Sequence, residues 1–277
     1  MSVGASRRDG KTAEPAGPGR SVARRASGAA LRWVSPIALL LLWQVLSATG
    51  VLPEKTLAGP AQIFSAAVDL TRSGELPEAL WISLQRAFFG LVLGTVFAIV
   101  LGIAAGVSRV GDLVVDPPMQ MIRTIPLFGL VPLFILWFGI GETPKVLLVA
   151  LGVVVPLYLN LVAALRGVDP ELLEVADTLR LTRTERWRHV IGPAVLPAAL
   201  VGFRQSLGIA WLALIVAEQI AASEGLGYMI NNARDFLQTD VIVVGLLAYA
   251  VLGLLTDALV RVLEKRALRY RDEGVRA

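Results

Sequence analysis

Long apolar stretches separated by short polar segments run through the sequence from residue 33 onward. A helix needs roughly 20 apolar residues to cross a bilayer core of about 30 Å. The stretches of suitable length predict six transmembrane helices and an all-α membrane protein. Their approximate bounds are Trp33–Gly50, Ile82–Gly106, Met119–Gly139, Val146–Leu165, Ala194–Ala221 and Val241–Leu263.

Prolines make the first and third stretches the least regular, because proline removes a backbone donor and breaks the helical ladder. Neighbouring helices of a bundle can satisfy the carbonyls that are freed, so these stretches still qualify as membrane spans. The prolines concerned are Pro36, Pro117, Pro118, Pro126 and Pro132.

The segment between the first two stretches, residues 51–81, is long enough to hold a helix of its own. Its apolar residues recur at a helical spacing, which predicts a short amphipathic helix at the membrane surface. The expected apolar stripe is Ile63, Phe64, Ala67, Val68 and Leu70.

Composition and charge agree with a membrane protein and predict its orientation. The chain is 55% hydrophobic, its mean hydropathy is +0.67 and its net charge is only +4. Twenty of the 26 Lys and Arg lie at the two ends of the chain and in the segments after the second and fourth stretches. Since cytoplasmic segments collect basic residues, we expect both termini in the cytoplasm. The alternate segments hold only Lys55, Arg72, Lys145 and Arg234.

The pattern divides the chain into a transmembrane domain over residues 33–266 and two polar tails. The amino tail, residues 1–32, is rich in Ala, Gly, Ser and Arg and is expected to be a disordered cytoplasmic segment. The carboxyl tail, residues 267–277, is expected to be cytoplasmic as well. The basic start also resembles a signal peptide, with Leu46-Ser47-Ala48 as a loose cleavage site. Because the tail is long and five more stretches follow, we expect the first stretch to be retained.

The sequence offers little for catalysis, metal binding or nucleotide binding. It has no cysteine and one histidine, His189, which excludes a thiol nucleophile, a Cys-ligated metal and a His cluster. Gly10-Lys11-Thr12 ends like a phosphate-binding loop, but five residues instead of four separate Gly4 from Gly10, and no strand precedes them. We therefore expect no cofactor, no metal, no nucleic-acid partner, and an energy source in another polypeptide.

The most distinctive polar segment is the loop at about residues 169–193. Asp169, Pro170 and Glu171 are typical of a helix start. Thr182-Arg183-Thr184-Glu185 fits a capping box that would start a second short helix. Two short helices at an angle form a knob with apolar ridges and a charged rim, which suits docking on another protein. The plainer interpretation is a solvated connector whose charges only fix the topology.

This loop resembles the EAA loop of ATP-binding-cassette (ABC) importer permeases, whose pattern is roughly E-A-A-x-x-x-G, nine residues, then I-x-L-P. Glu174, Val175 and Ala176 occupy the E-A-A positions, and Val190 and Pro193 fall near the end. Other segments are similar, in order, to the subgroup that imports sulfonates, taurine, nitrate and related molecules. They are Ser83-Leu84-Gln85-Arg86, Asp116-Pro117, Arg123-Thr124-Ile125-Pro126, residues 132–142, Val168-Asp169, Gly208-Ile209-Ala210-Trp211, Ala217-Glu218 and Gly225-Leu226-Gly227.

Two positions of the loop depart from the family pattern. The glycine of the pattern falls on Arg180, and the leucine before its proline falls on Gly192. Glycine accepts a positive φ without steric cost, so Arg180 must either accept strain or change the turn. The departure affects the shape of the knob and not the family resemblance.

The resemblance implies a type I, MetI-like bundle that acts as the permease subunit of an importer in the bacterial cytoplasmic (inner) membrane. It implies a second permease copy, cytoplasmic ABC ATPase subunits and an extracytoplasmic substrate-binding protein. Nucleotide-driven closure of the ATPases would open the pathway alternately to each side. The expected solute is a small anion such as a sulfonate, taurine or nitrate, with a thiamine-precursor-like pyrimidine as another candidate. The expected ATPase contacts are Glu174, Ala176, Asp177, Arg180, Leu181 and Pro193.

Ionisable residues inside the predicted helices are the remaining functional candidates. Arg204 lies several residues inside the fifth stretch, where it can attract an anionic solute or pair with an acid on another helix. Glu218, near the outer end of that stretch, is a second pathway candidate, or it reaches water or a loop amide. Structural roles are expected for four others, namely headgroup contacts for Arg86 and Arg123 and a local ion pair for Asp257 and Arg261.

Two other classes of protein compete with a permease that has no chemistry of its own. A secondary transporter driven by an ion gradient would usually show paired acids or broken helices near the membrane midplane. The acids here lie close to the ends of the predicted helices, which counts against this class. An intramembrane enzyme would need a nucleophile–base pair or a metal dyad on facing helices, and the sequence supplies neither.

Overall fold

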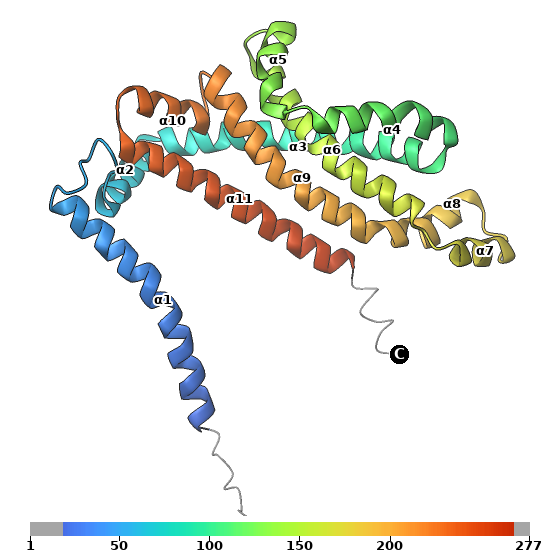
Figure 1. Cartoon of the computed structure of the whole chain (residues 1–277), viewed down its shortest axis with the longest axis horizontal. Helices are drawn as coiled ribbons and strands as arrows, with labels where there is room; N and C mark the ends of the chain where they lie inside the picture. The colour runs from blue at the N-terminus through green and yellow to red at the C-terminus, as the bar shows by residue number, and fades with distance from the viewer. Residues whose placement is uncertain (1–18, 269–277) are drawn as a thin grey trace, which may run out of the picture.

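The computed structural model describes residues 19–268, with side chains from Val34 onward except that of Ala221. Gly10-Lys11-Thr12 and most of the carboxyl tail lie outside this part of the chain. All regular elements within residues 19–268 are helices, as predicted. Figure 1 shows long helices that run side by side and short helices that gather at the ends of the bundle.

Four long helices confirm four of the predicted spans, because each is long and apolar enough to cross a membrane. Contacts between successive turns show that α3 and α6 run in the same direction, while α9 runs the opposite way. The four helices are α3 (Glu75–Val107), α6 (Glu142–Arg166), α9 (Gly192–Ala221) and α11 (Thr239–Ala267).

Small residues allow α3 to lie directly against α6. A Cβ on Gly90 would come within 2.5 Å of Val149 Cβ, and a Cβ on Gly94 within 2.5 Å of the carbonyl oxygen of Ala150. Any side chain at these two positions would push the helices apart. Helices in membranes commonly pack through such residues, because close backbone contact replaces the hydrophobic driving force of water.

The third predicted span, Met119–Gly139, is wrong as a single helix. The chain bends by 95° after α4, so that this segment belongs to two helical bodies. Ile125 is extended (φ −77°, ψ 129°), since Pro126 disfavours the helical conformation in the residue before it. The elements are α4 (Arg109–Thr124), the 3₁₀ helix η1 (Leu127–Leu130) and α5 (Val131–Phe138).

The first helix, α1 (Gly19–Ala48), begins inside the segment assigned to the amino tail and covers most of the first predicted span. Residues 19–32, part of the tail expected to be disordered, are helical, in line with the helix propensity of Ala and Arg. Within the residues whose side chains are described, its apolar part is Val34–Ala48. The described residues thus give four spans, or five with the bent pair, and the predicted sixth is not confirmed.

The amphipathic helix predicted between the first two stretches exists as α2 (Pro60–Ser73). It begins after Gly59, whose N–H donates to Oε1 of Gln62 at 2.8 Å. Ile63 is buried in a cluster that also contains Val244 of α11, while Phe64 is exposed. Most of the predicted stripe is therefore at least partly buried, and Phe64 is the exposed member.

Short helices mark the two ends of the bundle (Figure 1). One end carries α7 (Pro170–Thr178) and α8 (Arg183–Arg186), and we name it the loop end. The other carries α10 (Leu226–Asp235), and we name it the α10 end.

The second short helix predicted in the loop is not a separate element. It continues through a five-residue π-helical turn, η2 (Trp187–Ile191), directly into α9. Gly192 N–H donates to the carbonyl of Trp187, five residues back, which widens the turn. The widened turn accommodates Pro193, whose ring clashes with the tighter turn of a regular α-helix.

Candidate functional site

The local signals read in the loop at residues 169–193 form the predicted caps. Oδ1 of Asp169 accepts the N–H of Glu171 at 2.9 Å at the start of α7. Thr182 N–H donates to Oε2 of Glu185 at 2.8 Å, and Glu185 N–H donates back to Oγ1 of Thr182 at 3.3 Å. The hydroxyl and the N–H of Thr182 stabilise the ionised carboxylate of Glu185 and lower its pKa. Both helix starts are therefore set by the sequence close to them.

The turn between α7 and α8 has the shape that the family glycine would favour, although arginine occupies it. Arg180 has a φ of 50°, in the left-handed region. Its N–H donates to the carbonyl of Asp177 at 2.9 Å, and Leu181 N–H donates to that of Ala176 at 3.0 Å. These two bonds form a Schellman motif at the end of α7. Arg180 thus accepts strain and leaves the turn unchanged.

An apolar stripe on α7 faces away from the rest of the chain. Leu172, Val175 and Leu179 are 47%, 55% and 66% exposed. Their spacing of three and four residues places them on one side of the helix. Three exposed aliphatic side chains on one side of a short polar loop form a surface suited to another protein. The sequence identified the apolar side of α7 but not which part of it is left uncovered.

The residues predicted to contact an ATPase occupy different environments. Glu174 and Arg180 are exposed, and Glu174 lies roughly 130° around the helix from the stripe at 100° per residue. Asp177 forms an ion pair with Arg186 of α8. Ala176 is 1% exposed, so it holds α7 in place from inside. Leu181 and Pro193 are half-buried.

At the α10 end, Arg86 and Glu218 form the centre of a buried polar cluster. Their side chains are 3% and 0% exposed, and Arg86 Nη1 lies 2.7 Å from Oε1 of Glu218. Arg86 also contacts Glu142 through two bonds, at 2.5 Å from Nε and 2.7 Å from Nη2. We name the set Ser83, Arg86, Glu142, Lys145, Glu218 and Tyr249 the α10-end cluster.

The other bonds of this cluster join separate parts of the chain. Oε2 of Glu218 accepts the Tyr249 hydroxyl at 2.6 Å and the Gly227 N–H at 2.9 Å. The Ser83 hydroxyl contacts Glu218 at 2.8 Å and accepts the Leu226 N–H at 2.9 Å. The bonds connect α3, α9, α10 and α11, while Glu142 and Arg86 add α6. A buried charge with this many partners is stably held.

The cluster corrects two interpretations of the sequence. Arg86 does not extend to the headgroups, because it is buried between two carboxylates. Glu218 is fully buried, and the amide that it reaches, the N–H of Gly227, lies in the first turn of α10 and not in a loop. The family-like segments containing Ser83, Arg86, Glu218 and Gly227 pointed to these residues without indicating that they touch, since more than 130 positions separate the two halves.

Arg204 pairs with an acid on another helix, which was one of its two predicted roles. Its Nε lies 2.9 Å from Oδ1 of Asp257 on α11. The predicted pair of Asp257 and Arg261 is confirmed as well, at 3.0 Å. Asp257 thus lies between two arginines, all partly exposed.

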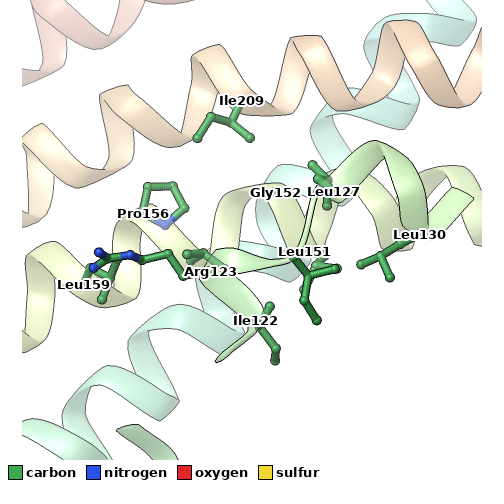
Figure 2. Close-up of a pocket in the computed structure, with 11 residues that line it drawn as sticks. Ile122, Arg123, Leu127, Leu130, Leu151, Gly152, Pro156, Leu159 and Ile209 are labelled. Carbon is green, nitrogen blue, oxygen red and sulfur yellow. The ribbon is translucent and has the colours of Figure 1, made fainter. Parts of the chain in front are cut away.

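A cavity of about 280 Å³ lies where α4 ends, between the bend and the middle of α6. Figure 2 shows Arg123 extended beside Pro156 and Leu159, with Ile209 of α9 across the space. Of the 11 residues that line the cavity, Arg123 is the charged one and the others are apolar. The sequence did not indicate a cavity here, because it depends on the bend at Pro126.

Residues 94–269 match the model of the family described as binding-protein-dependent transport system inner membrane component. The chain belongs to this family. It is therefore a multi-pass, inner-membrane component of a transport system, as the resemblance of the EAA-like loop implied. The family favours a permease subunit over the ion-gradient-driven transporter and over an enzyme.

Individual relatives place the permease near sulfonate and taurine transporters. It is 45% identical over 237 residues to the putative aliphatic sulfonates transport permease protein SsuC of Bacillus subtilis (strain 168). The aligned region covers 86% of each chain. The SsuC of Escherichia coli (strain K12) is 43% identical over 86% of this chain and 90% of the relative. The taurine transport system permease protein TauC of the same strain is 32% identical over 85% of this chain and 87% of the relative.

Solved structures support the fold of the permease. A crystal structure of an amino acid ABC transporter with histidines aligns with a TM-score of 0.60 at 19% identity, covering 72% of this chain and 97% of that one. An inward-facing form of the MetNI methionine ABC transporter aligns with a TM-score of 0.50 at 19% identity, covering 73% of this chain and 95% of that one. The chain thus has the predicted MetI-like helical fold.

Proposed function

We propose that the permease moves an aliphatic sulfonate, or a closely related small organic anion, into the cell by alternating access driven by a separate ABC ATPase. The observation that carries this proposal is the 45% identity to an SsuC protein along 86% of both chains. Identity to TauC is lower, so an aliphatic sulfonate is preferred over taurine. Nitrate and a pyrimidine become less favoured candidates.

The exposed stripe of Leu172, Val175 and Leu179 supports the loop end as the ATPase-docking surface. Its apolar side chains would be covered by the partner, and the exposed Glu174 and Arg180 would form part of the charged rim. Asp177, Ala176, Leu181 and Pro193 would act by fixing the shape of the loop. The continuous path from α8 into α9 would carry a displacement of the loop into the bundle.

The rest of the assembly follows from the same proposal. Twenty of the 26 basic residues lie on segments assigned to one side, which favours a cytoplasmic loop end and cytoplasmic termini. A second permease copy, a pair of ATPase subunits and an extracytoplasmic binding protein in a bacterial inner membrane would complete the importer. Pathway roles for Arg204 and Glu218 stay predictions, and a solute would have to compete with their protein partners.

Transport can be tested by reconstituting the permease with its ATPase and binding protein in liposomes. Uptake of radiolabelled ethanesulfonate should require ATP and should persist when ionophores collapse all ion gradients. Uptake that needs an ion gradient and no ATPase would support the secondary-transporter alternative. ATP-dependent uptake of nitrate with no sulfonate uptake would overturn the assigned substrate class.

Docking can be tested with single charges placed on the loop. Val175→Glu should abolish co-purification of the ATPase, because it introduces a carboxylate at the centre of the stripe. Glu174→Lys tests the rim and should abolish co-purification and transport while membrane insertion persists. Thr184→Glu is the matched control, since it adds the same charge at an exposed position of α8 away from the stripe. Normal co-purification by both Val175→Glu and Glu174→Lys would exclude this docking surface.

A further inference from the structure

Three arginines on helices of the bundle, Arg86, Arg123 and Arg204, differ in whether a carboxylate neutralises them. Arg86 has Glu142 and Glu218, and Arg204 has Asp257. No ion pair among residues 34–268 includes Arg123. In this part of the chain, Nη1 of Arg123 donates a hydrogen bond to the neutral Oε1 of Gln120 at 3.4 Å. Arg123 is also exposed, so its positive charge is available to a ligand.

Arg123 lies near the middle of the bundle and not at its end. The cavity beside it is bounded by Gly152, Pro156 and Leu159 of α6. At 1.5 Å per residue, Pro156 is about 21 Å from the start of α6 and about 15 Å from its end. This position favours a role inside the bundle over the predicted headgroup contact. An unpaired cation at this depth is costly unless it serves an anion or an aqueous path.

The backbone beside Arg123 is also irregular. Ile125 and Pro126 are non-helical at the 95° bend. Irregular backbone at membrane depth is tolerated where it is buried in protein or lines a cavity. Leu127, which follows the bend, and Ile209 of α9 both line the space opposite Gly152. The bend, the cavity and the guanidinium thus occur at one place.

Combining these features, and resting on the proposed function, we infer that this cavity is the anion-binding site of the translocation pathway. Arg123 binds the sulfonate group, and the apolar walls formed by Leu127, Pro156, Leu159 and Ile209 hold the alkyl chain. A guanidinium donates two parallel hydrogen bonds to oxyanions of this geometry. The volume of about 280 Å³ equals roughly nine water molecules, which suits a small amphiphile and not a large ligand.

Uptake in liposomes that contain the full importer tests whether sulfonate transport needs the positive charge of Arg123. Arg123→Gln should lower methanesulfonate and butanesulfonate uptake roughly tenfold or more, since it removes a charge-assisted interaction. Arg123→Lys should restore part of the loss. Arg234→Gln is the matched control and should leave uptake near the wild-type level, because it removes the same charge at an exposed position that pairs with Asp235 and does not line the cavity. If Arg204→Gln weakens uptake and Arg123→Gln does not, the site belongs to Arg204 and this inference is wrong.

The apolar walls are tested by chain length. Ile209→Phe should reduce the space for the alkyl chain and lower octanesulfonate uptake more than methanesulfonate uptake. The expected loss is roughly fourfold for each methylene that no longer fits. A uniform loss across chain lengths would overturn the assignment of the walls.

Two further results separate this inference from the proposed function. If the wild-type importer takes up no sulfonate, the proposed substrate class fails, and the site falls with it. If the wild type transports sulfonates and Arg123→Gln is unchanged, only the site is wrong. Light scattering of the purified permease adds a third comparison. Loss of the permease dimer in both Arg123→Gln and Ile209→Phe would show that a second copy fills the cavity, which also overturns the site.

Discussion

The two ends of the helical bundle are stabilised in opposite ways. At the α10 end, the buried Arg86 and Glu218 and the partly exposed Glu142 join residues far apart in the sequence through charge-assisted bonds. At the loop end, the bonds of Asp169 and Thr182 connect neighbours two or three residues apart, and the stripe on α7 is uncovered. The polar cluster at the α10 end is thus paired within one chain, whereas the loop end leaves an apolar stripe uncovered.

The polar groups at the two ends are therefore held in place in different ways. A fully paired cluster resists rearrangement, because moving one element leaves several groups without partners. A locally capped loop keeps its shape without neighbours, so it can bind and release another protein without unfolding. We expect substitutions at the α10 end to change the stability of the whole chain and substitutions at the loop end to change the loop alone.

The largest effect should come from breaking the α10-end cluster. Arg86→Met leaves Glu218 charged and fully buried without its cationic partner. Removing one member of a buried pair costs about 3–5 kcal/mol. Chemical denaturation of the permease in lipid nanodiscs should show this as a lower free energy of unfolding. Arg204→Met, whose ion pair is partly exposed, should cost less than about 1 kcal/mol. Equal losses would mean that burial of the cluster does not matter for stability.

A smaller loss is expected from crowding the same cluster without changing its charges. A Cβ on Gly227 would lie 2.4 Å from the Cβ of Glu218. Gly227→Ala should therefore displace Glu218 and cost about 1–3 kcal/mol in the same denaturation experiment. Gly208→Ala is the control, because nothing lies within 4 Å of a Cβ there. It should be neutral or slightly stabilising, and a comparable loss in Gly208→Ala would contradict the steric explanation.

The smallest effects should appear at the loop end and stay there. Arg180→Gly removes the left-handed strain, worth about 1–2 kcal/mol, but adds the entropy cost of glycine, so the net gain is at most about 1 kcal/mol. Thr182→Ala should have the opposite sign and cost about 1 kcal/mol through loss of the capping box. Hydrogen exchange of the α7 and α8 amides should slow in the first variant and accelerate in the second. A change in the global unfolding midpoint would show that the loop and the bundle are coupled in stability.

How much could be predicted from the sequence depended on the range of the interaction. The caps at Asp169 and Thr182 were predictable, because the residues that form them are adjacent. Four long helices were predictable from hydrophobicity alone. The bend at Pro126 was signalled by proline, but its size depends on how α4 and η1 pack. The contact of Arg86 with Glu218 was not predictable, since no local rule joins residues 132 positions apart. For the same reason, sequence reasoning assigned Arg123 to the headgroups and favoured Arg204 for the pathway, whereas the structure pairs Arg204 with Asp257 and shows no ion pair of Arg123 among residues 34–268.

The π-helical turn at Trp187–Ile191 makes α8 and α9 a single rod, with Arg183 near one tip and Ile220 at the other. Its 38 residues span about 57 Å. Tilting such a rod by only about 5° about one tip displaces the other by roughly 5 Å. A small rotation of the loop therefore produces a displacement that grows with distance along the α8–α9 helix. A hinge within this helix would reduce the displacement at its far end.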